Sequence, residues 1–196
     1  SYLVACTGLD ALTHAIEAYV STAHSPITDL HALDAVRQIA KHLTGAVAEP
    51  SNLVHQGPMM LASLEAGLAF SNAILGAVHA MAHSLGGYYD LAHGECNAIL
   101  LSAVIKHNYP ACPERYDKIA AAMGLKLQAD NAIANMELLV GTISQLREKV
   151  GVAANLKHLG VQAADITCLS EHALLDACLA TNPSRMDRRE IEEIYE

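Results

Sequence analysis

The chain has 196 residues, of which 52% are hydrophobic and 17% are charged, and its formal net charge is −9. This composition allows a large core within one sizeable domain and argues against intrinsic disorder. The acidic balance, without a cluster of basic residues, makes nucleic acid an unexpected partner.

Five cysteines are spread along the chain without a C-x-x-C pair, at Cys6, Cys96, Cys112, Cys168 and Cys178. An odd number without the spacing of a disulfide framework indicates reduced thiols, so we expect a cytoplasmic protein. We expect no signal peptide, because the first residues lack a charged segment followed by a long apolar run. The chain also begins without methionine, so we expect a cut or processed chain.

Apolar residues that recur at steps of three and four predict the helices of the first half. We expect these helices at Leu9–Val20, from Pro26 to about Val47, from Pro58 to about Ser71, and around His79 and His83. Ser25-Pro26 is a start signal, because proline suits the first turn of a helix. Glu49–Gly57 should be a loop, a break should fall near Ser71-Asn72, and Gly86-Gly87 should end the histidine-bearing helix.

The second half predicts further helices after a short connector at Tyr88–Ala92. We expect helices from His93 to about Asn108, at Glu114–Met123, at Ala129–Val150, from Asp165 to about Ala180 and at Asp187–Tyr195, with a single turn at Asn155–Leu159. Strands would place apolar residues at every second position, and this alternation is absent. The sequence therefore predicts a single all-α domain over residues 1–196, a multi-helix bundle of roughly eight to ten helices.

One segment is long and apolar enough to resemble a membrane span, namely Met59–Ala82. Glu65, Asn72 and His79 interrupt it, and ionisable residues inside a membrane are costly and rare. We therefore expect a buried helix pair and no membrane partner.

Five side chains are candidates for a metal site. Asp10 and His14 are four residues apart, as are His79 and His83, so each pair shares one helix face; His93 follows on a connection or at a helix start. A single histidine on an apolar face is more often a core residue, but three imidazoles in one apolar segment indicate a shared purpose. One carboxylate with imidazoles suits Zn²⁺, Fe²⁺ or Ni²⁺ rather than Ca²⁺ or Mg²⁺. The spacing leaves open which four of the five groups bind.

Three stretches resemble signatures of the iron-containing (group III) alcohol dehydrogenases. They are Gly8–Ser21 (GLDALTHAIEAYVS), Gly76–Gly87 (GAVHAMAHSLGG) and His93–Ala98 (HGECNA). The resemblance implies four metal ligands, which are Asp10, His14, His79 and His93. It implies that His83 is a non-ligand histidine that helps to relay the proton. It also implies an architecture like the helical domain of the dehydroquinate synthase-like fold. Ser84 departs from the proline usual in the family, with little expected consequence.

The resemblance implies the chemistry of an NAD(P)-dependent alcohol dehydrogenase. A divalent metal, Fe²⁺ first and Zn²⁺ or Ni²⁺ as alternatives, would polarise the alcohol oxygen, and hydride would pass to the nicotinamide of NAD or NADP. The substrate would be a small-molecule alcohol or aldehyde, and we expect a homo-oligomer. The family holds its cofactor on an N-terminal α/β domain with a Gly-rich phosphate loop, which nothing in this chain resembles. We therefore expect residues 1–196 to be the C-terminal helical metal-binding domain, inactive by itself.

Two alternatives remain open. The glycerol dehydrogenase-like branch of the same fold generally lacks a histidine four residues after the first acidic ligand, so His14 favours the iron-type branch. The other alternative is a non-catalytic helical oligomerisation domain with a residual metal site. Metal analysis of the purified protein, with and without chelator, would distinguish it from the metal-binding half of a dehydrogenase.

Overall fold

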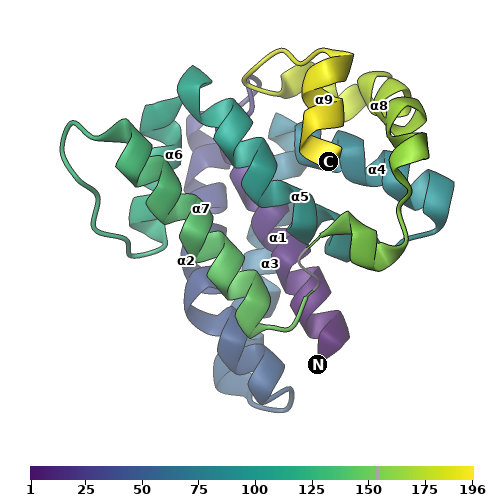
Figure 1. The fold of residues 1–196 in the computed structure, drawn as a ribbon. Helices are drawn as coiled ribbons and strands as arrows, with labels where there is room; N and C mark the ends of the chain where they lie inside the picture. The colour runs from purple at the N-terminus through teal and green to yellow at the C-terminus, as the bar shows by residue number, and fades with distance from the viewer. Residues whose placement is uncertain (153–154) are drawn as a thin grey trace.

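A computed structural model describes residues 1–152 and 155–196 and confirms the all-α fold class (Figure 1). The described residues contain nine α-helices and no strand. The α-helices are α1 (Tyr2–Val20), α2 (Pro26–Ala48), α3 (Leu53–Ala73), α4 (Ala77–Tyr89), α5 (His93–Asn108), α6 (Pro113–Ala122), α7 (Ala132–Lys149), α8 (Ile166–Leu174) and α9 (Arg188–Tyr195). The 3-10 helices are η1 (Tyr109–Ala111), η2 (Leu156–Leu159), η3 (Ala163–Asp165) and η4 (Ala177–Thr181).

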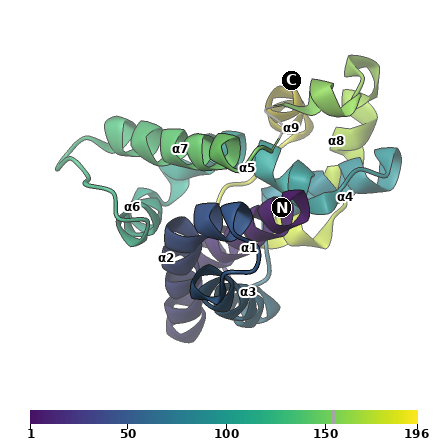
Figure 2. The same cartoon turned by 90° about the horizontal axis from the view of Figure 1, so that it is seen from below.

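The helices α1 and α5 lie side by side at the centre of the molecule (Figures 1 and 2). On one side, α2 and α3 pack against α1 and against each other. On another, α4 packs against α5, and α8 packs against both α4 and α9. The pair α6 and α7 forms a third group beside α2 and α5. This arrangement brings the first turns of α4 and α5 next to α1, where the candidate ligands lie.

Small side chains allow α3 to pack closely into this bundle. Four alanines at steps of three and four along α3 have no exposed surface: Ala62, Ala66, Ala69 and Ala73. Such a stripe defines the buried face of a helix. The opposite face is apolar as well but exposed, with Met60, Leu61, Leu64 and Leu68 at its surface. The pattern of α3 therefore differs from that of an ordinary surface helix, whose outer face is polar.

Two helices begin earlier than the sequence predicts. The first helix starts at Tyr2 rather than Leu9, and the third starts at Leu53 rather than Pro58. The expected loop over Glu49–Gly57 was therefore too long. The side-chain oxygen of Asn52 accepts a hydrogen bond from the backbone N–H of Val54 and caps the helix there. α3 continues through Pro58 in its second turn, where the missing N–H leaves one backbone bond, to the Val54 carbonyl, unmade.

The break expected near Ser71-Asn72 lies two residues later, between α3 and α4. Ile74 ends α3 with φ 62° and ψ −165°, a conformation that a β-branched residue rarely adopts. The Thr181 hydroxyl donates to the Leu75 carbonyl at 2.7 Å and helps to hold this junction. Within the described residues, no single helix is long and apolar enough to cross a membrane; α3 and α4 reach that length and composition only together, across a bend of 100°.

Two helix ends also differ from the prediction. Gly86-Gly87 does not end α4, which continues to Tyr89 before Asp90 turns into the left-handed region with φ 55°. Packing against α8 outweighs the low helix propensity of glycine, and the Ser84 hydroxyl donates to the Leu169 carbonyl at 2.8 Å. The helix expected from Asp165 to about Ala180 ends at Leu174, and the separate 3-10 helix η4 follows. The helix η4 begins separately because the Asp176 side chain accepts a hydrogen bond from the Cys178 backbone N–H and caps it.

The capping predictions for α2 and α9 are confirmed. Ser25 and Thr28 form a reciprocal capping box with Pro26 in the first turn of α2. Asp187 and Glu190 form the same motif at the start of α9. In both cases residues three apart satisfy each other's backbone N–H groups, so the signal was contained in local sequence.

Candidate metal centre

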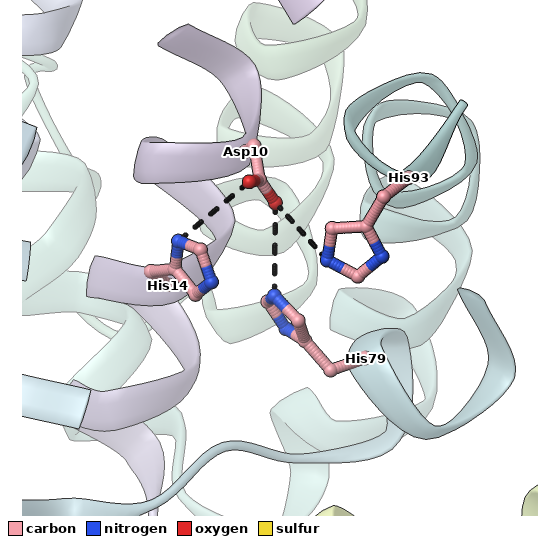
Figure 3. A group of neighbouring side chains, drawn as sticks. All are labelled: Asp10, His14, His79 and His93. Carbon is pink, nitrogen blue, oxygen red and sulfur yellow. Dashed lines mark ion pairs between the residues drawn. The ribbon is translucent and has the colours of Figure 1, made fainter. Parts of the chain in front are cut away.

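Three helices supply four side chains that converge on one point (Figure 3). Asp10 and His14 lie one turn apart on α1, His79 is in the first turn of α4, and His93 is the first residue of α5. The Asp10 carboxylate points between the three imidazole rings (Figure 3). The structure thus brings the two helices that carry the candidate ligands and the start of α5 together.

The separations between the donor atoms match a site for one divalent ion. Asp10 Oδ1 lies 3.7 Å from His79 Nε2 and 3.6 Å from His93 Nε2, and Asp10 Oδ2 lies 3.9 Å from His14 Nδ1. All four donor atoms lie within 4.8 Å of one another. Four ligands at about 2.1 Å from a tetrahedral ion would stand roughly 3.4 Å apart, so only small side-chain shifts would be needed.

Asn97 provides an independent indication that a cation belongs here. Its side-chain Nδ2 lies 2.6 Å from Asp10 Oδ1, 3.1 Å from His79 Nε2 and 3.0 Å from His93 Nε2. The amide has only two hydrogens for these three electron-rich atoms, and its own Oδ1 is buried without a partner. A cation would satisfy all three ligand atoms at once, which the amide cannot do. The residues present therefore fit a divalent metal.

The surroundings shift the pKa values of these groups in opposite directions. Burial lowers the pKa of His14 to about 4 and also lowers that of His93. Burial alone would lower the pKa of His79, but the Asp10 and Glu17 carboxylates outweigh it and raise that pKa to about 9. The Asp10 pKa stays below its usual value despite burial, because the imidazoles and Asn97 favour the carboxylate. Without metal at neutral pH, His14 and His93 are thus unprotonated and ready to coordinate.

His83 lies beside this group but is not one of its four donor residues. Its ring stacks on His93 with the centroids 5.2 Å apart, and its Nδ1 lies 2.8 Å from Asp176 Oδ2. The side chain is 44% exposed, whereas that of His79 is 1% exposed. Helical spacing left His83 open as a metal ligand. Its hydrogen bond to Asp176 favours instead the role of a non-ligand histidine that relays the proton. His83, Asp176 and Cys178 also form a second group of donor atoms within 4.8 Å of one another.

The sequence did not predict Asn97, Asp176 or Glu17 as part of the site. Asn97 could have been found, because it lies four residues after His93 and so shares its helix face. Asp176 meets His83 across 93 positions, and Glu17 meets His79 across 62. No spacing rule joins residues so far apart, so these two contacts carried no local signal.

The fold and the site together define an all-helical domain with a three-histidine, one-carboxylate centre. Residues 4–196 match the family model described as Fe-containing alcohol dehydrogenase family, C-terminal. The chain is 46% identical to 1,3-propanediol dehydrogenase from Citrobacter freundii over 193 residues, which covers 98% of this chain and 50% of that enzyme. The chain therefore belongs to the iron-containing alcohol dehydrogenase family, as the sequence motifs indicate.

Solved structures support the same assignment. The alcohol dehydrogenase from Oenococcus oeni superposes with a TM-score of 0.96 at 40% identity, over 98% of this chain and 50% of that one. The sulfoacetaldehyde reductase from Bifidobacterium kashiwanohense, solved in complex with NAD⁺, superposes with a TM-score of 0.88 at 29% identity, over 99% and 49%. The present chain spans about half the length of these relatives.

Proposed function

We propose that this chain is the metal-binding half of an NAD(P)-dependent alcohol dehydrogenase that interconverts small alcohols and aldehydes. The observation that carries the proposal is the convergence of Asp10, His14, His79 and His93 from three helices. Fe²⁺ is the expected metal because of the family, and Zn²⁺ and Ni²⁺ suit the same ligand types. When bound, the metal supplies Lewis acidity to the alcohol oxygen.

The side chains around the centre have separate tasks in this proposal. His83 takes up the alcohol proton, and Asp176 holds its Nδ1 so that Nε2 is free to accept. A cavity of about 330 Å³ beside His83, lined also by His172, Tyr88 and Asp176, gives the proton a route to solvent. Phe70 stacks on His14 at 4.5 Å between centroids and keeps one side of the centre apolar. The nicotinamide, NAD or NADP, would be held by the half that the relatives carry in addition.

We further propose that the protein is a cytoplasmic homo-oligomer. All five cysteines are free, as expected in a reducing compartment. The apolar outer face of α3, with Met60, Leu61, Leu64 and Leu68, supports association because large exposed apolar patches mark interaction sites. Light scattering on the purified protein tests the oligomer, and a monomer at micromolar concentration would count against it.

The test of the proposed function combines metal analysis with a dehydrogenase assay on protein purified without oxygen. We expect about one equivalent of divalent metal and alcohol-dependent reduction of NAD or NADP when the cofactor-binding half is present. His14→Ala and His93→Ala should each lower metal affinity at least about tenfold, because each removes a ligand. His158→Ala, a change of an exposed histidine, is the matched control. Unchanged metal content in both ligand variants would refute the assignment.

A further inference from the structure

Glu17 on α1 is an acid buried against the start of α4. Only 3% of its surface is exposed. Its Oε1 accepts the Val78 backbone N–H at 2.6 Å, and its Oε2 accepts the Gly76 N–H at 3.1 Å. The same Oε2 lies 2.6 Å from the imidazole Nδ1 of His79. A buried carboxylate is tolerated only when donors surround it, and here every one of these donors belongs to a single turn of chain.

Anchoring the α4 start does not by itself require a carboxylate. The neighbouring N–H of Ala77 is bound by a neutral amide, because Asn182 Oδ1 accepts it at 3.1 Å. Asn182 is in turn paired with Asn108, Nδ2 to Oδ1 at 2.8 Å. Two residues therefore hold the same helix start, one charged and one neutral. What separates them is that Glu17 also contacts a ligand side chain and Asn182 does not.

The contact between Glu17 and His79 decides which imidazole nitrogen faces the metal centre. The carboxylate can only accept, so His79 Nδ1 must carry the proton. His79 Nε2 is then the nitrogen that faces Asp10 Oδ1, 3.7 Å away, and Asn97 Nδ2, 3.1 Å away. A carboxylate that accepts a hydrogen bond from the second nitrogen of a ligand histidine fixes the orientation of the ring and makes the other nitrogen a stronger metal ligand.

We propose that Glu17 is the positioning residue of the metal centre, which fixes the His79 tautomer and ties His79 to the start of α4. This inference rests on the proposed function, since it assigns a task toward the metal of that same site. It adds a residue of α1, seven positions after Asp10, to the machinery. One helix then supplies two ligands and also the group that orients a third.

The decisive variant is Glu17→Gln, which keeps the shape and replaces the carboxylate by an amide. The amide oxygen can still accept from Val78 N–H, but its NH₂ group then faces His79 Nδ1 and drives the proton onto Nε2, and the Gly76 N–H loses its acceptor. We expect Zn²⁺ affinity, measured by competition with a chromophoric chelator, to fall about 10–100-fold. We also expect an altered d–d spectrum for the Co²⁺-loaded Glu17→Gln protein and an unaltered one for Asn182→Ala, which removes an anchor of the same helix start without contacting His79.

Asn182→Ala is the matched control. It removes the other anchor of the α4 start, so thermal stability should fall while Zn²⁺ affinity stays within about threefold of the unmodified protein. Equal loss of metal affinity in both variants would overturn the inference, since Glu17 would then be a structural anchor only. If Glu17→Gln does not fold, Glu17→Asp gives the same readout, because it keeps the charge but withdraws it from Nδ1 by one methylene. Unchanged affinity in the folded Glu17 variant likewise overturns the inference.

These outcomes are independent of turnover. If the protein with its cofactor-binding half binds Zn²⁺ but shows no alcohol-dependent reduction of NAD or NADP, the proposed function is contradicted, while the ratio of the Zn²⁺ affinities with and without Glu17→Gln still tests the role of Glu17. If the protein reduces the cofactor normally and Glu17→Gln leaves its Zn²⁺ affinity unchanged, the proposed function stands and the role of Glu17 is refuted.

Discussion

Gly94 lies so close to Cys6 that a Cβ at this position would stand 2.6 Å from the Cys6 carbonyl oxygen and 3.3 Å from Asp10 Cβ. The contact is between the first turn of α5 and the backbone of α1. It follows directly after His93, so it sets how near this candidate ligand can come to Asp10. The glycine is needed here for close approach of two helices rather than for an unusual φ angle.

Gly94→Ala should therefore weaken metal binding without changing a ligand. The obstacle is a backbone carbonyl, which cannot turn aside as a flexible side chain can, so α5 must shift away from α1. We expect at least about tenfold lower metal affinity and a loss of about 1–3 kcal/mol in stability. A metal titration and urea denaturation measure the two effects.

Gly87→Ala is the control for this change. Gly87 lies within α4, and a Cβ there would meet no atom within 4 Å. This substitution should keep the metal affinity and raise stability by up to about 1 kcal/mol, because alanine is the better helix former. If both variants bind metal as the unmodified protein does, close approach of α5 to α1 is not what places His93.

His83→Ala should separate metal binding from turnover. In the protein with its cofactor-binding half, we expect full metal content and a loss of about 10²–10⁴-fold in turnover, the usual contribution of a general acid–base group. Asp176→Asn should cause a smaller loss, because the amide still accepts at its oxygen but no longer favours the same tautomer. Metal-free His83→Ala together with metal-loaded His93→Ala would show that the two histidines have been assigned in the wrong order.

The sequence predicted the helices well where their signals were local. Ser25-Pro26 and Asp187 carried capping chemistry within three residues, and both starts were predicted correctly. The errors arose where tertiary contacts outweighed propensity. Gly86-Gly87 remained helical within α4, which packs against α8 and is joined to it through Ser84. Asp176 began a new 3-10 helix in a stretch whose apolar pattern predicts one continuous helix.

The candidate ligands were predicted for a different reason. Asp10 with His14 and His79 with His83 follow helical spacing, but spacing could not tell a ligand from its neighbour. The resemblance to the family motifs separated the candidate ligands from His83, and in the structure the Nδ1 of His83 lies against Asp176. Glu17 was not predicted, since its partner His79 is 62 positions away and no periodic pattern connects them.

The metal-free protein should be most stable near pH 6.5. The His79 pKa is raised to about 9 in the fold, so its contribution is complete below the unfolded value near 6.5 and is lost as the pH rises through 9. The loss amounts to up to about 3 kcal/mol. The His14 pKa is lowered to about 4, so the fold binds fewer protons than the unfolded chain between 4 and 6.5, and stability falls on the acid side too.

Urea denaturation in the presence of a chelator at pH 5, 6.5 and 8.5 measures this profile. His79→Gln should remove the alkaline decline and leave the acid one, while saturating Zn²⁺ should abolish the alkaline decline because the metal displaces the proton. Stability that rises steadily from pH 6.5 to 8.5 in the metal-free protein would contradict the raised pKa of His79.

Residues 1–196 on their own should bind a divalent metal but fail to oxidise alcohols. Hydride transfer requires the nicotinamide carbon to be held roughly 3–3.5 Å from the alcohol carbon, and this placement supplies much of the rate. Dinucleotide phosphates are usually held where a strand turns into a helix, and the described residues contain no strand. His83 and His93 are 44% and 40% exposed, so the centre is open to water here and metal affinity should be weak.

Circular dichroism should show a helical protein, and a metal titration should show binding that His14→Ala removes. An assay with a short alcohol and either NAD or NADP should show no reduction above the buffer rate. Clear turnover by residues 1–196 alone would place the cofactor site within this helical domain and contradict the proposal that the other half of the enzyme holds NAD or NADP.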